Sequence, residues 1–170
     1  MAELSAAAPA GVAASERDVL LATKLHVPRL QRGFVPRPRL VEALDAGLAR
    51  RLILVCGPPG SGKTALLADW AWRAGRPVAW LSLDAGDNDP ARFWRHAVAA
   101  VDRVRPGIAE RAGPLPGPPA PPSFEGLVTA LINELAAQPG EGELLLVLDG
   151  YHLIDAQQVR AQGRRRAYPH

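Results

Sequence analysis

LILVCGPPGSGKT, residues 52–64, is the stretch that decides the fold. Its first part, residues 52–56, is an unbroken apolar run closed by glycine and proline, which is typical of a β-strand buried on both faces. Its second part, residues 57–64, matches the pattern GxxxxGK followed by Ser or Thr. Residues 63–74 then carry apolar side chains at helical spacing and stop at Gly75, so the stretch predicts a strand, a loop and a helix in that order.

The loop of this stretch has the chemistry of a phosphate-binding site. Glycines let the backbone curl so that successive N–H groups face one centre, and the following helix adds its positive end. Lys63 is expected to reach the β and γ phosphates, and the Thr64 hydroxyl is expected to hold magnesium. The predicted phosphate-binding residues are Gly57, Pro58, Pro59, Gly60, Ser61, Gly62, Lys63 and Thr64.

A second apolar run, residues 144–148, ends at Asp149. Ligands of open α/β sheets bind at the carboxyl edge of the strands, so Asp149 is predicted to bind the magnesium ion together with Thr64. The alternative is an aspartate that only caps a turn. Hydrolysis also needs a group that orients the attacking water, and the position after Asp149 holds Gly150 rather than a second acid. The sequence therefore supports nucleotide binding better than turnover.

The other expected elements alternate in the same way. A strand is expected over residues 77–83, and helices over residues 38–49, 90–104 and 123–135, the second of them opened by the pair Asp89 and Pro90. Seven prolines in residues 106–122 predict a stiff, exposed connection instead of regular structure. Apolar strands separated by helices indicate an α/β protein with a parallel sheet, here a P-loop NTPase.

Several polar and aromatic residues have a structural and a functional interpretation. Asp84, Asp87 and Asp89 are expected to form a turn and a helix cap rather than a metal cluster, because their spacing does not fit an EF-hand loop. His152 could reach a γ phosphate, although a role in packing or in a turn is the alternative we favour. The four tryptophans and Cys56 are expected to belong to the core or to cover helices.

Composition sets the broad class. Of the 170 residues, 48% are hydrophobic and 22% charged, which is typical of a globular protein. The net charge of +3 comes from four arginines in residues 160–166, so basicity indicates nothing about partners of the globular part. The single cysteine cannot form an internal disulfide, which fits a cytoplasmic protein. No apolar run is long enough to span a membrane, and residues 1–19 and 160–170 are expected to be a disordered leader and a basic tail around a domain at 20–159.

Together the motifs resemble a known family. LATKL (21–25), VPRPRL (35–40), the phosphate loop, AWLSLD (79–84), DNDP (87–90) and LVLDGYHLI (146–154) occur in the order seen in the large ATP-binding LuxR-type transcriptional regulators, the MalT-like group of STAND-type P-loop NTPases. The resemblance implies an ATPase switch domain that binds ATP and Mg²⁺, with Val35 and Arg37 near the adenine. It further implies self-association through this domain, and a DNA-binding domain that this chain does not contain.

The chain departs from the family pattern at two places. Where the family usually has two adjacent aspartates, this chain has Asp149 and Gly150, which implies weak or no hydrolysis. After residue 159 the sequence no longer resembles the family. A truncated gene or a shifted reading frame would produce such an ending. In this class another strand normally lies between the phosphate-loop strand and the metal-binding strand, so the chain is expected to be marginally stable and prone to aggregate unless these two strands pair directly.

Two other functions stay open from the residues alone. One is a small autonomous P-loop kinase that phosphorylates a metabolite, which would need a base and a covering basic segment near the phosphates. The other is a relic without function. The leading hypothesis is an ATP-binding and Mg²⁺-binding switch domain of a transcriptional regulator.

Overall fold

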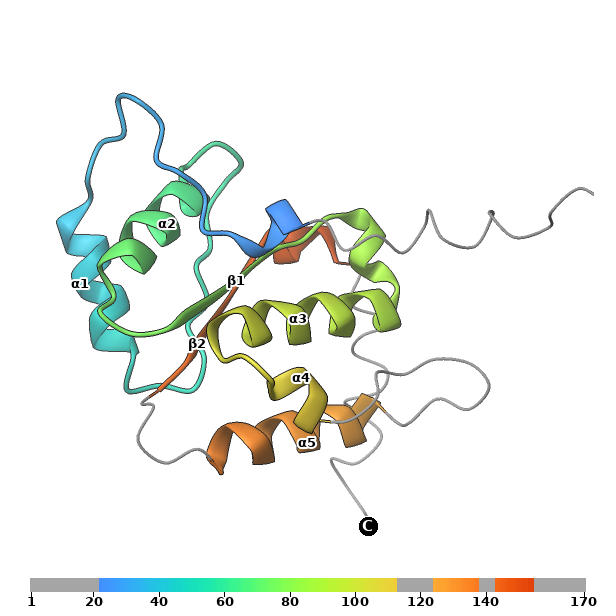
Figure 1. The fold of residues 1–170 in the computed structure, drawn as a ribbon. Helices are drawn as coiled ribbons and strands as arrows, with labels where there is room; N and C mark the ends of the chain where they lie inside the picture. The colour runs from blue at the N-terminus through green and yellow to red at the C-terminus, as the bar shows by residue number, and fades with distance from the viewer. Residues whose placement is uncertain (1–21, 113–123, 138–142, 155–170) are drawn as a thin grey trace, which may run out of the picture.

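Two parallel strands with helices on both faces form the domain (Figure 1). The computed structural model describes residues 22–112, 124–137 and 143–154. The strands are β1 (Val78–Ser82) and β2 (Leu145–Asp149). One face carries α1 (Pro38–Gly47) and α2 (Lys63–Arg73), and the other carries α3 (Pro90–Val104), α4 (Ile108–Arg111) and α5 (Phe124–Ala136). The prediction of an α/β fold with a parallel sheet is confirmed.

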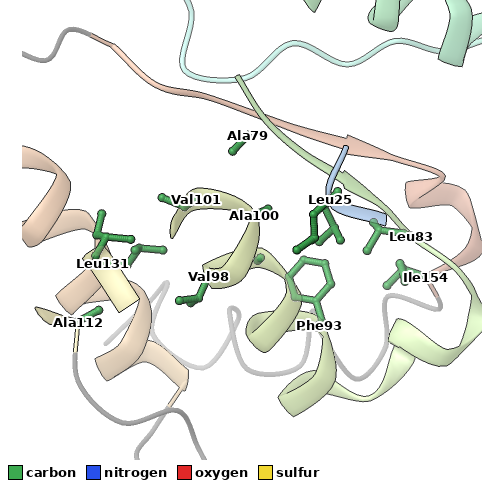
Figure 2. Close-up of a cluster of buried hydrophobic side chains, with 13 residues drawn as sticks. Leu25, Ala79, Leu83, Phe93, Val98, Ala100, Val101, Ala112, Leu131 and Ile154 are labelled. Carbon is green, nitrogen blue, oxygen red and sulfur yellow. The ribbon is translucent and has the colours of Figure 1, made fainter. Parts of the chain in front are cut away.

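The strands separate two hydrophobic clusters because side chains alternate across a sheet. Trp80 and Val147 face α1 and α2, where they pack with Leu44, Leu66 and Trp70. Ala79 and Leu81 face the opposite side and pack against α3. Figure 2 shows this second cluster, in which Phe93, Val98 and Val101 of α3 lie below β1 and Leu131 of α5 closes one end.

The register of β1 and β2 places the ends of both strands side by side. Val78 lies opposite Leu145 and Ser82 lies opposite Asp149. The ladder continues one residue further, because the backbone N–H of Leu83 donates to the carbonyl oxygen of Asp149 at 2.8 Å. The carboxyl end of β2, with Asp149, is therefore held directly beside the chain that leaves β1.

Helix boundaries follow the local chemistry that the sequence displays. Asp89 caps α3 by accepting a hydrogen bond from the backbone N–H of Arg92 at 2.8 Å, and Pro90 occupies the first turn, as predicted. Helix α2 begins at Lys63 directly after Gly62, and Gly75 follows its end with a φ of 60°. Both helices lie within a residue or two of their predicted ranges.

The predicted strand at residues 52–56 is wrong. The segment is extended, but no backbone hydrogen bond joins it to another residue in the described ranges, and Leu52 and Leu54 are 80% and 74% exposed. Ile53 and Val55 do pack beside the cluster under α1 and α2. The apolar pattern predicted burial on both faces, which requires neighbouring strands, and here only one face finds a neighbour.

The predicted connection at residues 106–122 is also partly wrong. Prolines at 106 and 114 bracket a proline-free stretch, and within it the short helix α4 forms and buries Ile108 completely. Two residues expected to belong to the core or to cover helices, Trp72 and Cys56, are exposed. Trp72 instead donates its indole N–H to the carbonyl oxygen of Pro28 at 3.3 Å.

Some predictions lie outside the described residues. These are the leader at 1–19, the tail at 160–170, the first residue of the helix expected over residues 123–135 and most of the proline-rich stretch. Within the described residues, no helix combines the length and the apolar character needed to cross a membrane.

We predict that the exposed leucines before the phosphate loop contribute little to stability. Leu52→Lys with Leu54→Lys should change the free energy of unfolding in urea by less than about 0.5 kcal/mol per site, since both side chains face solvent, and should reduce aggregation. Leu81→Ala, at a buried position of β1, should cost about 2–5 kcal/mol. A double lysine variant as unstable as Leu81→Ala would contradict the exposed segment.

Candidate nucleotide site

The loop before α2 adopts a curled backbone that only glycines enter easily. Gly60 and Gly62 have φ values of 76° and 78°, in the left-handed region that disfavours residues with a Cβ. The turn is closed by a hydrogen bond from the Ser61 N–H to the Pro58 carbonyl oxygen at 3.2 Å. A Cβ on Gly57 would lie 2.9 Å from the Ser61 Oγ. These glycines therefore let the loop backbone curl without a side chain filling the space inside the loop.

Two cations reach this loop from different elements. The Lys63 ammonium donates to the carbonyl oxygens of Gly57 and Pro58 at 2.8 and 3.0 Å. Arg37, the residue before α1, donates from Nη1 to the carbonyl oxygen of Ser61 at 2.7 Å. Both cations therefore lie on the loop where phosphate oxygens were expected to bind, although Arg37 was predicted near a base rather than at the loop itself.

Thr64 and Asp149 meet across 85 residues of sequence. The Thr64 hydroxyl lies 2.9 and 3.0 Å from the two carboxylate oxygens of Asp149, to which it donates. Thr64 comes from the first turn of α2 and Asp149 from the last residue of β2. The structure thus brings together the two residues that the sequence assigned to magnesium.

This oxygen pair suits a hard divalent cation. Mg²⁺ binds to proteins through one or two oxygen side chains and keeps its other positions for water and phosphate oxygens. A hydroxyl and a carboxylate 2.9 Å apart, beside a loop that two cations contact, supply such a set. The residues present therefore fit a triphosphate with its magnesium ion.

Comparison with known proteins agrees with this geometry. Residues 37–162 match the family described as the AAA ATPase domain. The chain belongs to this family. The match includes the phosphate loop, α2, both strands and Asp149.

Similar proteins are much longer than this chain and match it over part of their length. The serine/threonine-protein kinase PknK of Mycobacterium tuberculosis is 34% identical over 143 residues, which is 82% of this chain and 13% of PknK. The HTH-type transcriptional regulator MalT is 37% identical over 137 residues in Cronobacter sakazakii and 31% identical over 138 residues in Vibrio cholerae. These two matches include 80–81% of this chain but only 15% of each MalT protein. The expected similarity to the ATPase portion of MalT-like regulators is confirmed.

Gly150 allows the turn that follows Asp149 in this AAA ATPase domain. Its φ is 83°, and a Cβ at this position would lie 2.8 Å from the carbonyl oxygen of Leu83. In the sequence alone, position 150 differs from the family pattern only in that it lacks the second acid. The structure adds a reason, because a side chain there would strain the backbone and collide with Leu83, the residue after β1.

An open hollow of about 520 Å³ lies beside Arg37 and is lined by Arg37, Pro38, Arg39 and Leu40. Its volume is in the range of small-molecule sites. Val35, the other residue predicted near the adenine, is exposed and is not among these lining residues. His152 is exposed in the short 3₁₀ helix η4 (Tyr151–Leu153), beyond Gly150.

The acidic turn after β1 has the structural role predicted for it and one that the sequence did not reveal. Asp84 caps the 3₁₀ helix η3 (Ala85–Asn88) by accepting from the Gly86 N–H, and Asp87 accepts from the Asp84 N–H. Asp87 is also fully buried against Lys24 and His96. Both Lys24 and Asp87 lie in the motifs that carry the family resemblance, which is the signal that could have paired them.

We predict that Gly150 is more sensitive to substitution than a glycine of equal backbone conformation elsewhere. Gly33→Ala, at a φ of 85° with open space around its Cβ, should cost about 1–2 kcal/mol of unfolding free energy from the backbone alone. Gly150→Ala should cost more, because its Cβ would also meet the Leu83 carbonyl oxygen. Urea unfolding of both variants measures the difference, and equal losses would argue against the close contact.

Proposed function

We propose that this chain binds ATP with Mg²⁺ and acts as the switch domain of a MalT-like transcriptional regulator, with weak or no hydrolysis. The observation that carries the proposal is the contact between the Thr64 hydroxyl and the Asp149 carboxylate beside the glycine loop. Membership of the AAA ATPase domain family supports nucleotide binding. The similarity to MalT, whose name describes a transcriptional regulator, supports the regulatory role.

The loop backbone, the two cations beside it and the neighbouring hollow have separate roles in this proposal. Backbone N–H groups of Gly60 and of residues 62–64 would bind the phosphate oxygens, helped by the N-terminus of α2. Lys63 would exchange its two carbonyl partners for phosphate oxygens, and Arg37 is near enough to add a second cation there. The hollow beside Arg37 would accept the base.

Thr64 and Asp149 would hold the magnesium ion, which supplies positive charge to the β and γ phosphates when it is bound. The chain itself offers little for turnover. A group that orients water is needed beside the metal, and Gly150 cannot provide it because its backbone conformation and its contact with Leu83 leave no place for a side chain. Binding and release of nucleotide, rather than rapid hydrolysis, would then set the state of the domain.

We predict that Lys63→Ala weakens ATP binding. Loss of a charge-assisted contact to the phosphates should cost about 1.5–3 kcal/mol, or roughly ten- to hundredfold in Kd. Titration of a fluorescent ATP analogue, with unlabelled ATP as competitor, measures this change. Arg50→Ala, an exposed cation outside the loop, is the control and should bind as the unmodified chain does. Equal affinity of Lys63→Ala and the control would refute the phosphate assignment.

We predict that Asp149→Asn removes the effect of magnesium and leaves metal-free binding intact. The carboxylate charge attracts the cation, whereas the loop donors act on the phosphates alone. ATP titrations in EDTA and in excess MgCl₂ separate these contributions. The unmodified chain should bind ATP more tightly with Mg²⁺, and the variant should show a similar Kd in both buffers. A full magnesium effect in Asp149→Asn would place the metal elsewhere.

A further inference from the structure

A buried group of ionisable side chains lies on the turn after β1 and has no contact with the phosphate loop, Thr64 or Asp149 among the contacts of the described residues. Lys24, Asp87 and His96 are 8%, 0% and 3% exposed. The Lys24 ammonium lies 2.6 Å from Asp87 Oδ2 and 2.8 Å from Asp84 Oδ2, and His96 Nδ1 lies 2.7 Å from Asp87 Oδ1. Burial of charge is costly even when it is paired, so such a group is weak evidence for stability and points to another role.

Both carboxylates of this group are held in the ionised form. For Asp87, burial raises the pKa, but hydrogen bonds from Lys24, the Asp84 N–H and His96 outweigh it and lower the pKa below its ordinary value. The hydrogen bond from Lys24 likewise lowers the pKa of Asp84. The side chains that contact Asp87 come from two elements, since Lys24 lies in the 3₁₀ helix η2 (Ala22–Leu25) and His96 in α3. Arg92 of α3 adds a third, with its Nε 3.5 Å from Asp87 Oδ1.

The group therefore fixes the turn at residues 84–88 from two sides. Asp87 belongs to η3, and its carboxylate also accepts from the Asp84 N–H, so the charges and the backbone of the turn form one unit. The turn cannot shift without separating Asp87 from η2 or from α3.

The chain from Leu83 to Asn88 in turn contacts the chain that follows β2 at three points. The Leu83 N–H donates to the carbonyl oxygen of Asp149, and Gly150 packs directly on the Leu83 carbonyl. The Asn88 side-chain amide donates to the carbonyl oxygen of Leu153 at 3.2 Å. Leu83 and Ile154 also lie close together at one end of the cluster in Figure 2. Residues 149–154 therefore pack against residues 83–88, the segment that Lys24, Asp87 and His96 hold in place.

We propose that Lys24, Asp87 and His96 are positioning residues for the magnesium side of the nucleotide site. They hold the turn after β1, the turn holds residues 149–154, and this places the Asp149 carboxylate against Thr64. The inference rests on the proposed function, because it assigns these residues to the binding of Mg²⁺ with ATP. Partners that orient metal ligands from behind typically contribute ten- to hundredfold to metal affinity.

The test replaces the buried pair by apolar residues, with Lys24→Met and Asp87→Leu in one chain. Apolar replacement of both partners avoids a lone buried charge, which would unfold the domain for unrelated reasons. The matched control is Arg76→Met with Glu143→Leu, which removes the ion pair of 2.8 Å at the opposite ends of the same two strands. A further variant, Asn88→Ala, removes the hydrogen bond to Leu153 together with the one to the Ala85 carbonyl oxygen, and keeps Lys24, Asp87 and His96 in place.

Two measurements separate positioning from stability. The first is the Kd for ATP in EDTA and over a MgCl₂ titration, where the double variant should keep its metal-free affinity within about twofold while the apparent affinity for Mg²⁺ falls about tenfold. The second is hydrogen exchange of the backbone amides at 149–154 in the nucleotide-free protein, which should become faster in the double variant and in Asn88→Ala but not in the control.

The possible results are distinguishable. Unchanged magnesium affinity and unchanged exchange at 149–154 in both the double variant and Asn88→Ala would overturn the inference. If the double variant does not fold, Asn88→Ala decides by the same two measurements. If the unmodified chain binds no ATP, or binds it equally with and without Mg²⁺, the proposed function fails first, and the inference fails with it whatever the variants do.

Discussion

The parallel pairing of β1 with β2 is the constraint on which the described structure depends. Ser82 lies opposite Asp149, so both strands end at the same edge. Side chains alternate across this pair, and the two hydrophobic clusters on its faces hold α1 and α2 on one side and α3, α4 and α5 on the other. Because α2 begins at the same edge, Thr64 and Asp149 come within hydrogen-bond distance although 85 residues separate them.

The sequence was sufficient wherever a local pattern carries its own physical reason. The glycine loop, the helix after it, the capped start of α3 and the apolar run before Asp149 all depend on neighbours within a few residues. Pairing of Thr64 with Asp149 followed from one general rule, that parallel strands present their carboxyl ends to the same site. The site could therefore be assembled from the sequence before the structure was considered.

Predictions of burial and contact failed where they depend on distant parts of the chain that a local sequence pattern does not reveal. Residues 52–56 have the composition of a central strand, yet Leu52 and Leu54 face solvent because no strand pairs with this segment in the described ranges. Cys56 is exposed for the same reason, because it lies on the same side of the segment as these two leucines. The contact of Arg37 with the phosphate loop could not be predicted either, because it depends on where α1 packs, and the place of Arg37 near a base stays a prediction. Lys24 and Asp87 could not be paired from spacing, as 63 residues separate them.

Gly150 connects the geometry of this edge with the chemistry that the site can perform. The close approach of residue 150 to the Leu83 carbonyl keeps the turn after β2 tight and keeps Asp149 beside Thr64. The same approach excludes a side chain at the position next to Asp149, where under the proposed function a second acid would help to orient water. A carboxylate introduced there would have to move the turn, and with it Asp149, before it could act. The arrangement that places Asp149 beside Thr64 is thus the one that leaves no room for a second acid at position 150.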